Sequence, residues 1–355
     1  MRELLPQLID RVRQGPVALA RVVGVTGAGP RAAGAAMLVT EDGEVVGSVS
    51  GGCVEAAVVE SAMGVLGGGD AVLERFGVAE PEGVAIGLTC GGEMEVFIEP
   101  VAGERLGDLL ALEHEIRQGR SVALVTTLDD APSWWLIGSG APGPGVSRDA
   151  VHMARAGRTG TVGIDECAPT AFPPRAFVQS FGPRARMILA GANDFVRALS
   201  RLGGQLGYRV TVVDARKTFA TAARFPAADE VVVDWPHRYL RREYVAGRVD
   251  GRTVVCVLTH DAKFDVPLLV EALGIEDIGF VGALGSRRTH ADRLARLAEA
   301  GVGPEQLRRL RSPVGLDLNA STPEETAVSI AAQIIAEPGG ASGRPLAATD
   351  GPIHH

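Results

Sequence analysis

Two turns that combine a cysteine with a pair of glycines carry the most distinctive chemistry in this chain of 355 residues. Their sequences are SVSGGCVE at residues 48–55 and TCGGEME at residues 89–95. Glycine lets a bound group approach the backbone closely, and a thiolate is a soft ligand for a sulfur-rich or metal-bearing group. A single cysteine more often packs a tight turn as a small apolar residue. The repeated pattern, with Glu55 in one turn and Glu93 in the other, favours a joint binding site.

The elements on either side make the two cysteines unequal. Residues 44–49 have strand character and residues 56–65 have helical character, so Cys53 is expected in the first helical turn. Unpaired backbone N–H groups and the helix dipole stabilise a thiolate at such a position. Cys90 precedes a strand at residues 94–98 and has no such support. We therefore expect Cys53 to be the more important thiol.

A second region, residues 187–216, has the pattern of a dinucleotide-binding fold. Residues 187–190 are a short apolar strand, residues 194–206 have helical spacing, and residues 208–213 form another strand. Asp214 ends that strand, about 20 residues after the glycine turn. Strand, turn, helix, strand and terminal acid together predict a Rossmann-like, doubly wound parallel sheet in an α/β protein.

The turn of this region departs from the nucleotide-binding fingerprint. Gly191, Asn193 and Val196 stand where the G-x-G-x-x-G pattern has three glycines. A side chain at the second position obstructs a pyrophosphate at the helix N-terminus, and Asp194 adds negative charge there. The fold is therefore predicted without NAD(P), for which we expect an affinity no better than roughly millimolar.

Further strands are expected at residues 231–234, 253–258 and 278–281, so several polar side chains follow the carboxyl ends of parallel strands. Doubly wound sheets bind their ligands at that edge. The candidate binding residues there are Gly191, Asp214, Arg216, His260, Asp261, Gly285, Ser286 and Arg287. Arg287 and Arg288 begin a helix, where the dipole prefers anions, and a bound phosphate would explain them.

Composition excludes several classes of function. The net charge is −8, which argues against a nucleic-acid partner because phosphate binding needs clustered Lys and Arg. No apolar run reaches the roughly 18 residues of a membrane span, and the N-terminus lacks the pattern of a signal peptide. The four cysteines contain no CxxC pair, so a zinc site is not expected. We expect a reduced, cytoplasmic protein.

Turn-rich stretches of low periodicity divide the chain. We expect an N-terminal α/β domain with the glycine–cysteine turns at residues 1–140 and an inter-domain linker at residues 141–185. The Rossmann-like domain is expected at residues 186–337. Residues 338–355 contain many Gly and Pro residues and are expected to be a disordered tail.

Taken together, these sequences resemble the XdhC/CoxI family over nearly the whole chain. The glycine–cysteine turns are similar to the family's two signature turns, and the resemblance extends to THDAKFD at residues 259–265 and GALGSRR at residues 282–288. The residues that match the signature turns are Ser50, Gly51, Gly52, Cys53 and Glu55, followed by Cys90, Gly91, Gly92 and Glu99. Members of this family are accessory proteins that mature molybdenum hydroxylases such as xanthine dehydrogenase and carbon monoxide dehydrogenase.

The resemblance implies a cofactor-binding chaperone rather than a catalyst. Such a protein binds molybdenum cofactor (molybdopterin), protects it while a terminal sulfur is installed, and passes it to an apo molybdenum hydroxylase. A cysteine desulfurase is then a further partner, Cys53 is a candidate ligand of the molybdenum, and the protein is expected to be a homodimer. The cofactor would lie in a cleft between Cys53 and the carboxyl edge of the second sheet.

Two other functions remain open at this point. One is an NAD(P)-dependent oxidoreductase, which the fold permits and the turn chemistry disfavours. The other is a non-catalytic adaptor between a cysteine desulfurase and an apo-enzyme.

Overall fold

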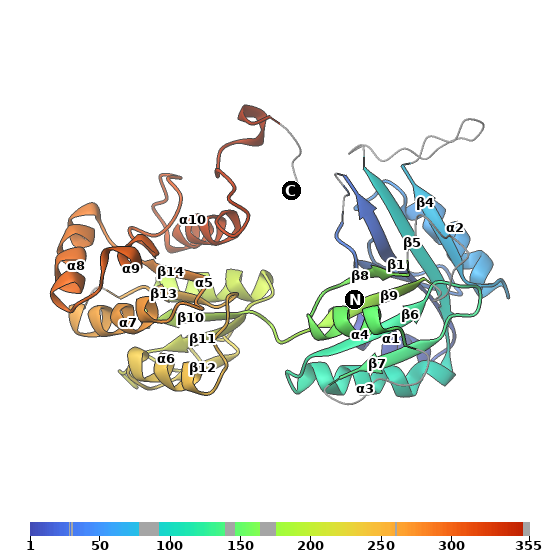
Figure 1. Cartoon of the computed structure of the whole chain (residues 1–355), viewed down its shortest axis with the longest axis horizontal. Coiled ribbons are helices and arrows are strands. Elements are labelled where there is room, and N and C mark those ends of the chain that lie inside the picture. Colours follow the sequence, from blue (N-terminus) through green and yellow to red (C-terminus); the bar gives the residue numbers. More distant parts are fainter. Residues whose placement is uncertain are drawn as a thin grey trace. The chain divides into compact units, whose positions relative to one another are not determined.

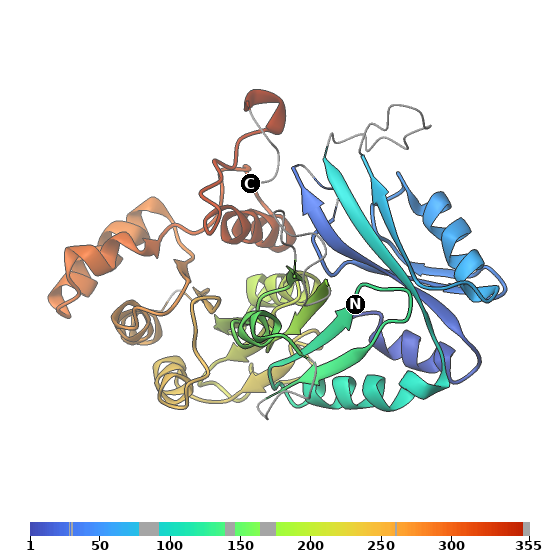
Figure 2. The same ribbon diagram turned by 45° about the vertical axis from the view of Figure 1, so that its right-hand side comes forward.

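The computed structural model describes residues 1–27, 29, 31–77, 92–138, 146–163, 175–259 and 261–350. The chain forms two compact units, Met1–Pro183 and Arg184–Asp350. Figures 1 and 2 show that strands dominate the first unit, whereas helices cover both faces of a single sheet in the second.

The first unit contains two antiparallel sheets. In spatial order, the strands of the first sheet are β3 (Val45–Gly47), β2 (Ala36–Thr40), β1 (Val17–Thr26), β5 (Glu93–Val101) and β4 (Val72–Phe76). Those of the second sheet are β7 (Trp134–Ile137), β6 (Val122–Thr127), β9 (Ala176–Phe181) and β8 (Gly160–Val162). The helices are α1 (Leu5–Val12), α2 (Glu55–Leu66), η1 (Gly103–Arg105), α3 (Leu106–Arg117) and α4 (Arg148–Arg155).

The two-residue period of the strands divides the core of this unit. In β1, Val17 and Leu19 pack between the two sheets, whereas Ala18 and Ala20 pack against α2 on the outer face of the first sheet. Helices α1 and α3 join the core between the sheets, and α4 covers the outer face of the second sheet. Both faces of each sheet therefore carry a hydrophobic core, whereas the edge strand β3 is largely exposed.

A buried ion pair lies between the two sheets. Arg21 on β1 and Glu99 on β5 are 0% and 1% exposed. One guanidinium nitrogen, Nη2 of Arg21, donates to Glu99 and, at 2.8 Å, to the hydroxyl of Thr126. The indole N–H of Trp134 donates to the other Glu99 oxygen at 2.8 Å, and the ring of Phe177 lies 5.6 Å from the guanidinium carbon. Thr126, Trp134 and Phe177 belong to the second sheet, so this pair joins the two sheets.

The second unit is built on a six-stranded parallel sheet. In spatial order, its strands are β12 (Glu230–Val232), β11 (Arg209–Val213), β10 (Arg186–Ala190), β13 (Val254–Val257), β14 (Phe280–Ala283) and β15 (Leu310–Arg311). Its helices are α5 (Asp194–Gln205), α6 (Pro236–Val245), α7 (Ala262–Gly274), α8 (Arg287–Glu299), α9 (Pro304–Arg308), α10 (Pro323–Ala336) and η2 (Leu346–Ala348).

This arrangement confirms the Rossmann-like, doubly wound sheet predicted from the sequence. Helices α5 and α10 pack on one face of the sheet, and α6 and α7 pack on the other. The chain first adds strands on one side of β10 and then returns to the other side, so the strand order reverses between β10 and β13. Ligands of doubly wound sheets bind at the carboxyl ends of the strands at such a switch point.

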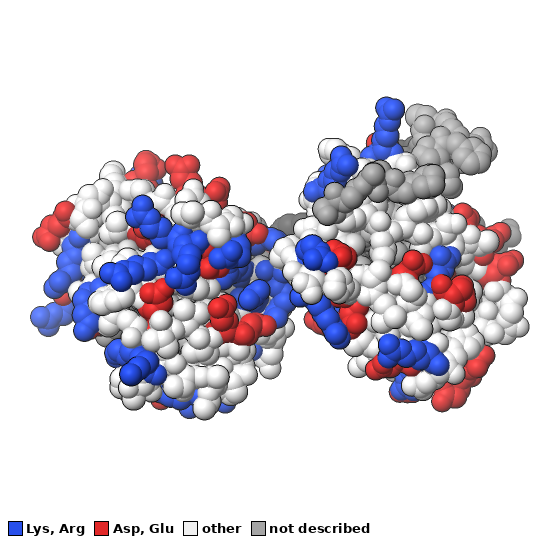
Figure 3. All heavy atoms as spheres, turned by 90° about the horizontal axis from the view of Figure 1, so that it is seen from below, with Lys and Arg blue, Asp and Glu red and all other residues white. Residues whose placement is uncertain are grey.

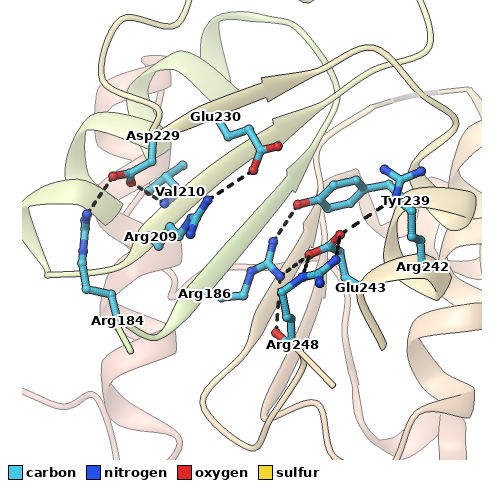
Figure 4. Close-up of polar contacts among 10 residues, drawn as sticks. All are labelled: Arg184, Arg186, Arg209, Val210, Asp229, Glu230, Tyr239, Arg242, Glu243 and Arg248. Atoms are coloured by element: carbon cyan, nitrogen blue, oxygen red, sulfur yellow. Dashed lines mark hydrogen bonds and ion pairs between the residues drawn. The ribbon is translucent and has the colours of Figure 1, made fainter. Parts of the chain in front are cut away.

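Ion pairs hold α6 to the opposite, amino-terminal edge of this sheet. Glu243 on α6 accepts hydrogen bonds from Arg186 at 2.5 Å and from Arg248 at 2.7 Å (Figure 4). The hydrogen bonds from Arg248, together with those from Arg186, lower the pKa of Glu243 to about 2. Figure 3 shows Lys and Arg side chains gathered on the face of the second unit that carries α6. Acids of the chain neutralise part of this charge, as the pair of Arg184 with Asp229 does at 2.7 Å.

The structure corrects the expected linker at residues 141–185. Helix α4 and strands β8 and β9 lie within that segment, and β9 pairs with both β6 and β8. These elements are short and flanked by Gly, Pro and Arg, so their sequence shows little periodicity. Pairing with β6, which is distant in sequence, makes them part of the first unit. The boundary between the units falls between Pro183 and Arg184.

The described part of the expected tail, residues 338–350, contains the single 3-10 turn η2 and contributes nothing to the hydrophobic core. Within the described residues, no helix combines the length and the apolar character that crossing a membrane requires.

We predict that Arg21→Met lowers the free energy of unfolding of the first unit by about 3–5 kcal/mol, because Glu99 would remain buried without its cation. The exposed pair of Arg13 with Asp10 supplies the control, and Arg13→Met should leave the stability nearly unchanged. Denaturant unfolding of both variants, followed by circular dichroism, measures the difference. Equal stability of the two variants would show that the buried pair is dispensable.

Candidate functional site

Glycine-rich loops of the first unit lie at one end of its first sheet. The strand ends there are Thr26 of β1, Ala36 of β2, Gly47 of β3, Phe76 of β4 and Glu93 of β5. Neighbouring strands are antiparallel but do not end level, because Thr26 lies opposite Glu93 whereas Ala36 lies opposite Arg21, five residues earlier along β1. The turn that carries Cys53 is therefore at the same end of the sheet as Gly92 and the loop that follows β1, but it is set back along the strands.

The carboxylate of Glu55 organises the Cys53 turn. One of its oxygens, Oε1, accepts hydrogen bonds from the backbone N–H groups of Ser50 and Gly51, both at 2.9 Å, and from the hydroxyl of Ser48 at 2.8 Å. The other, Oε2, accepts from the N–H of Gly52 at 2.8 Å and from the hydroxyl of Ser50. Successive N–H groups thus enclose an anion supplied by the chain itself.

The Ser50 hydroxyl satisfies the remaining donors of the turn. It accepts hydrogen bonds from the N–H groups of Cys53 at 3.0 Å and Val54 at 3.1 Å. Gly51 and Gly52 have φ values of +87° and +125°, and among the described residues nothing lies within 4 Å of a Cβ placed on either. The turn is therefore tied down from within and open on its outer side, where Cys53 is exposed.

These hydrogen bonds shift the titration of Glu55. Burial raises the pKa of its carboxyl, but the hydrogen bonds from Ser50, Ser48 and Gly51 together exceed that effect and hold the pKa far below its ordinary value of 4.5. Glu55 is therefore ionised at any pH near neutrality.

The expected position of Cys53 in the first turn of a helix is wrong. Helix α2 begins at Glu55, and its N-cap is Val54. Glu55 therefore occupies the acidic first-turn position that the helix dipole favours. The sequence pattern placed the start of the helix too early. The apolar residues with helical spacing begin at Ala56, and they do not show which of the preceding residues is the N-cap.

Only part of the second glycine–cysteine turn can be placed. Cys90 and Gly91 lie outside the described residues. Gly92 enters β5, and a Cβ on Gly77 would lie 2.2 Å from its carbonyl oxygen, so β4 and β5 approach closely at this edge. Glu99, which the resemblance assigned to the same motif, is the buried partner of Arg21 and serves the core.

In the second unit, the turn after β10 is closed by contacts within the chain. Gly191 has a φ of +119°, and a Cβ there would lie 2.9 Å from the Thr259 side chain. The Asn193 side chain caps α5 by accepting from the Val196 N–H at 3.1 Å. Its amide group donates to the carbonyl of Leu258 at 2.7 Å, which ties the turn to the end of β13. Asn193, which stands where the nucleotide-binding fingerprint has a glycine, is thus the N-cap of α5. Asn is a preferred N-cap residue, so the sequence itself indicates this role.

Asp214 and Arg216 form a tight pair beside this turn. Asp214 is 3% exposed, and the guanidinium of Arg216 grips both its oxygens, with Nε at 2.9 Å and Nη2 at 2.7 Å. The same guanidinium lies 4.9 Å from the ring centroid of Phe219 and 5.9 Å from that of Phe264, in the first turn of α7. Asp261 caps α7 through the Lys263 N–H at 3.1 Å.

The residues after β14 lie at the same edge, beyond β13. Ser286 caps α8 by accepting from the Thr289 N–H at 3.1 Å, and Gly285 precedes it. Arg287 and Arg288, both exposed, form no ion pair with any residue that the structure describes. His260 lies outside the described residues. The strand ends therefore bring Asp214, Arg216 and the start of α7 together, with the Ser286 cap farther along the edge.

A buried network beneath this edge was missed by the sequence reasoning. Asp265 on α7 accepts hydrogen bonds from the Thr259 hydroxyl and from Arg293, which is 4% exposed. Arg293 also donates to the carbonyl of Leu284 at 2.8 Å. Thr259 and Asp265 open and close the THDAKFD motif, which therefore holds together the ends of β13 and β14. The contacts of Arg216 with the rings of Phe219 and Phe264 were also missed by the sequence reasoning, because they depend on the strand order.

The described residues contain no cluster of three or more His, Cys, Asp or Glu side chains suited to holding a metal ion.

Family models match most of the chain. Residues 187–334 match the XdhC Rossmann domain, and residues 11–77 match the XdhC and CoxI family.

Individual relatives match almost end to end. The chain is 28% identical over 324 residues to a probable xanthine dehydrogenase subunit of Bacillus subtilis (strain 168), covering 91% of this chain and 93% of that protein. It is 27% identical over 334 residues to the molybdenum cofactor insertion chaperone PaoD of Escherichia coli (strain K12), covering 94% and 87%. A crystal structure titled as a xanthine dehydrogenase from Bacillus halodurans aligns with a TM-score of 0.72 and 28% identity, over 98% and 97% of the two chains.

We predict that Glu55→Gln loosens the Cys53 turn, because an amide replaces one accepting oxygen with a donor. The free energy of unfolding should fall by roughly 1–3 kcal/mol, and the amide protons of Gly51 and Gly52 should exchange faster. The pKa of Glu55 is lowered on folding, so its contribution is present above about pH 4.5 and is lost as the pH falls further.

The difference between wild type and Glu55→Gln should therefore shrink in acid, as denaturant unfolding at several pH values would measure. The exposed Glu60 on α2 supplies the control, and Glu60→Gln should change neither quantity. A constant difference from neutral pH to about pH 3 would contradict the assignment.

Proposed function

The chain belongs to the XdhC and CoxI family, and we propose that it binds molybdenum cofactor and delivers it, sulfurated, to a molybdenum hydroxylase of the xanthine dehydrogenase or carbon monoxide dehydrogenase type. The observation that carries this proposal is the Cys53 turn, in which Glu55 and Ser50 hold every backbone donor from Ser50 to Val54 and leave the thiol exposed. The names of the relatives, a molybdenum cofactor insertion chaperone and a probable xanthine dehydrogenase subunit, support it.

Each unit, taken by itself, offers groups that suit a part of this cargo. Molybdopterin has a dithiolene-bound metal, a pterin ring and a terminal phosphate. The exposed Cys53 is a soft donor for the metal, and the open faces of Gly51 and Gly52 let a bulky group approach. Arg287 and Arg288 lie at the N-terminus of α8, where a phosphate would be held by both charge and helix dipole.

A chaperone receives its cofactor and passes it on, so the proposal also names the proteins that would act before and after this one. The proposal includes an apo molybdenum hydroxylase as receiver and a cysteine desulfurase as source of the terminal sulfur. It also includes a homodimer in the cytoplasm as the working form. In this proposal the protein is a chaperone rather than a catalyst, and its exposed thiol holds the metal and then releases it.

An NAD(P)-dependent oxidoreductase is supported less well. Asn193 fills the turn where a pyrophosphate would lie, and it uses the Val196 N–H for its own cap. The acid that would bind a ribose, Asp214, already has both oxygens engaged by Arg216. A simple adaptor, in turn, would have no need of an exposed thiol on a turn held by its own hydrogen bonds to Glu55 and Ser50.

We predict that Cys53→Ala abolishes retention of molybdenum and pterin with the fold intact, because it removes the exposed thiol of the turn, and that Cys90→Ala weakens retention less. The protein would be purified from cells that make the cofactor, with metal measured by mass spectrometry and pterin by fluorescence. Met63→Ala removes another exposed sulfur side chain, on α2, and should retain as much cofactor as wild type. Equal molybdenum content in wild type and Cys53→Ala would remove the thiol from the site.

We further predict that replacing both Arg287 and Arg288 with Ala lowers cofactor retention at least about tenfold, the effect of losing one or two charge-assisted hydrogen bonds to a phosphate. Arg296→Ala, an exposed arginine in the last turn of the same helix, is the matched control and should have no effect. The loss should also be steeper at low salt, because the attraction is electrostatic. Retention equal to that of Arg296→Ala would place the phosphate elsewhere.

A further inference from the structure

Asp214 is a buried carboxylate at the end of β11 whose partner is a side chain two residues further along the chain. The guanidinium of Arg216 offers two parallel N–H donors, and they meet the two carboxylate oxygens at 2.9 and 2.7 Å. The Arg216 side chain remains 48% exposed, although Asp214 is 3% exposed. The planar guanidinium of Arg216 thus extends from the solvent to the buried Asp214 carboxylate and takes up both of its oxygens as hydrogen-bond acceptors.

Aromatic rings flank the same planar group. The guanidinium carbon lies 4.9 Å from the ring centroid of Phe219, which is 44% exposed, and 5.9 Å from that of Phe264. Phe264 in turn packs against Trp235, with ring centroids 5.1 Å apart. Phe264 is 6% exposed, so Phe219 supplies the exposed aromatic surface and Phe264 the inner wall. Exposed aromatic surface beside a buried carboxylate is the combination that binds a flat ring with a polar edge.

We propose that Arg216 occupies the place of a 2-amino-4-oxopyrimidine ring, and that such a ring binds Asp214 in exchange for Arg216. This ring is shared by pterins and guanine. It carries a ring N–H next to an exocyclic amino group, so its edge presents the same parallel pair of donors as a guanidinium. Its flat face would stack on Phe219 and Phe264. The inference rests on the proposed function for its cargo, since molybdopterin contains this ring.

The position of Asp214 agrees with a ligand site. It follows β11, next to β10 and one strand away from the switch point of the sheet, at the edge where doubly wound folds bind ligands. In nucleotide-binding relatives of this fold, an acid here binds ribose hydroxyls. A ribose would leave the aromatic rings without a partner, whereas a flat ring uses both the carboxylate and the rings.

The exchange leaves the displaced arginine with an acid nearby. The charge of Asp261, at the start of α7, also acts on Arg216. Asp261 already pairs with Lys263 at 3.1 Å, so a guanidinium that turns toward it when the ring binds Asp214 would share this acid with Lys263. Binding would replace the two hydrogen bonds from Arg216 with two similar ones from the ring. The affinity would therefore depend on stacking and on the free-energy cost of displacing Arg216.

The test is a titration of the purified full chain with neopterin, GMP and AMP, followed by ring fluorescence or calorimetry. Asp214→Asn should weaken binding of neopterin or GMP at least about tenfold, because one forked pair is lost. Arg216→Ala should strengthen it about tenfold, because the internal competitor is gone, and Arg216→Lys should give a smaller gain since lysine cannot fork. AMP lacks the donor pair and should bind no better than buffer controls.

Control variants separate stacking from general damage. Phe219→Ala should weaken ring binding several-fold, whereas Leu206→Ala, which removes a similarly exposed apolar side chain from the end of α5, should not. Circular dichroism melts of all variants confirm folding, and Asp214→Asn keeps the size of the native side chain. A preference for neopterin would identify the pterin as the ring, and a preference for GMP would identify the guanine of a dinucleotide form of the cofactor.

Two results would overturn the inference. If Arg216→Ala weakens ring binding or leaves it unchanged, the Asp214–Arg216 pair only stabilises the turn. If NADH or NADPH binds more tightly than either ring and Asp214→Asn removes that binding, the site is a nucleotide site. Both results are independent of Cys53 and of molybdenum, so ring binding can fail while cofactor retention holds, and the reverse.

Discussion

A backbone N–H group needs an acceptor, and this constraint shapes both candidate sites. Glycine-rich turns have many such donors and few side chains to satisfy them. In the first unit, one carboxylate and one hydroxyl, from Glu55 and Ser50, serve the donors of the whole Cys53 turn. In the second unit, the Asn193 side chain caps α5 and fastens its turn to β13. Features that look like open anion sites in the sequence are therefore closed from within, and the groups left exposed are a thiol in one unit and arginines in the other.

The architecture of the second unit could be predicted from the sequence because its short strands alternate with long helices, such as α5 with 12 residues, α7 with 13 and α10 with 14. The strand at residues 187–190 and the helix that begins at Asp194 both have local signals, and both are observed. Residues 148–181 could not be predicted in the same way. Their strands do not alternate with long helices, and the place of β9 in the sheet is decided by its pairing with β6, which is far away in sequence. The boundary between the units moved accordingly, to Pro183 and Arg184.

The candidate sites show the same division between local and long-range information. Glu55 was recognised as part of the motif, but its role requires a chain reversal that brings a helix residue back onto the preceding turn. Arg216 and Asp214 are two residues apart and were both identified, yet the rings that flank them come from Phe219 and from the start of α7, across the end of β10. Residue types thus indicated where chemistry could occur, and the packing of elements decided which groups remain available for it.

Internal partners also suit a protein that must release its cargo. A site whose buried acid is bare binds tightly, because ligand binding relieves an unsatisfied charge. A site whose acid already holds Arg216 gains only the difference between two similar pairs, so binding becomes an exchange of moderate affinity. The same holds for the Cys53 turn, whose donors are satisfied by Glu55 before any ligand arrives. On the proposed function, the empty protein would stay ordered without cargo, and a client enzyme with a deeper site would take the cofactor over, because only the difference in affinity between the two proteins determines the direction of transfer.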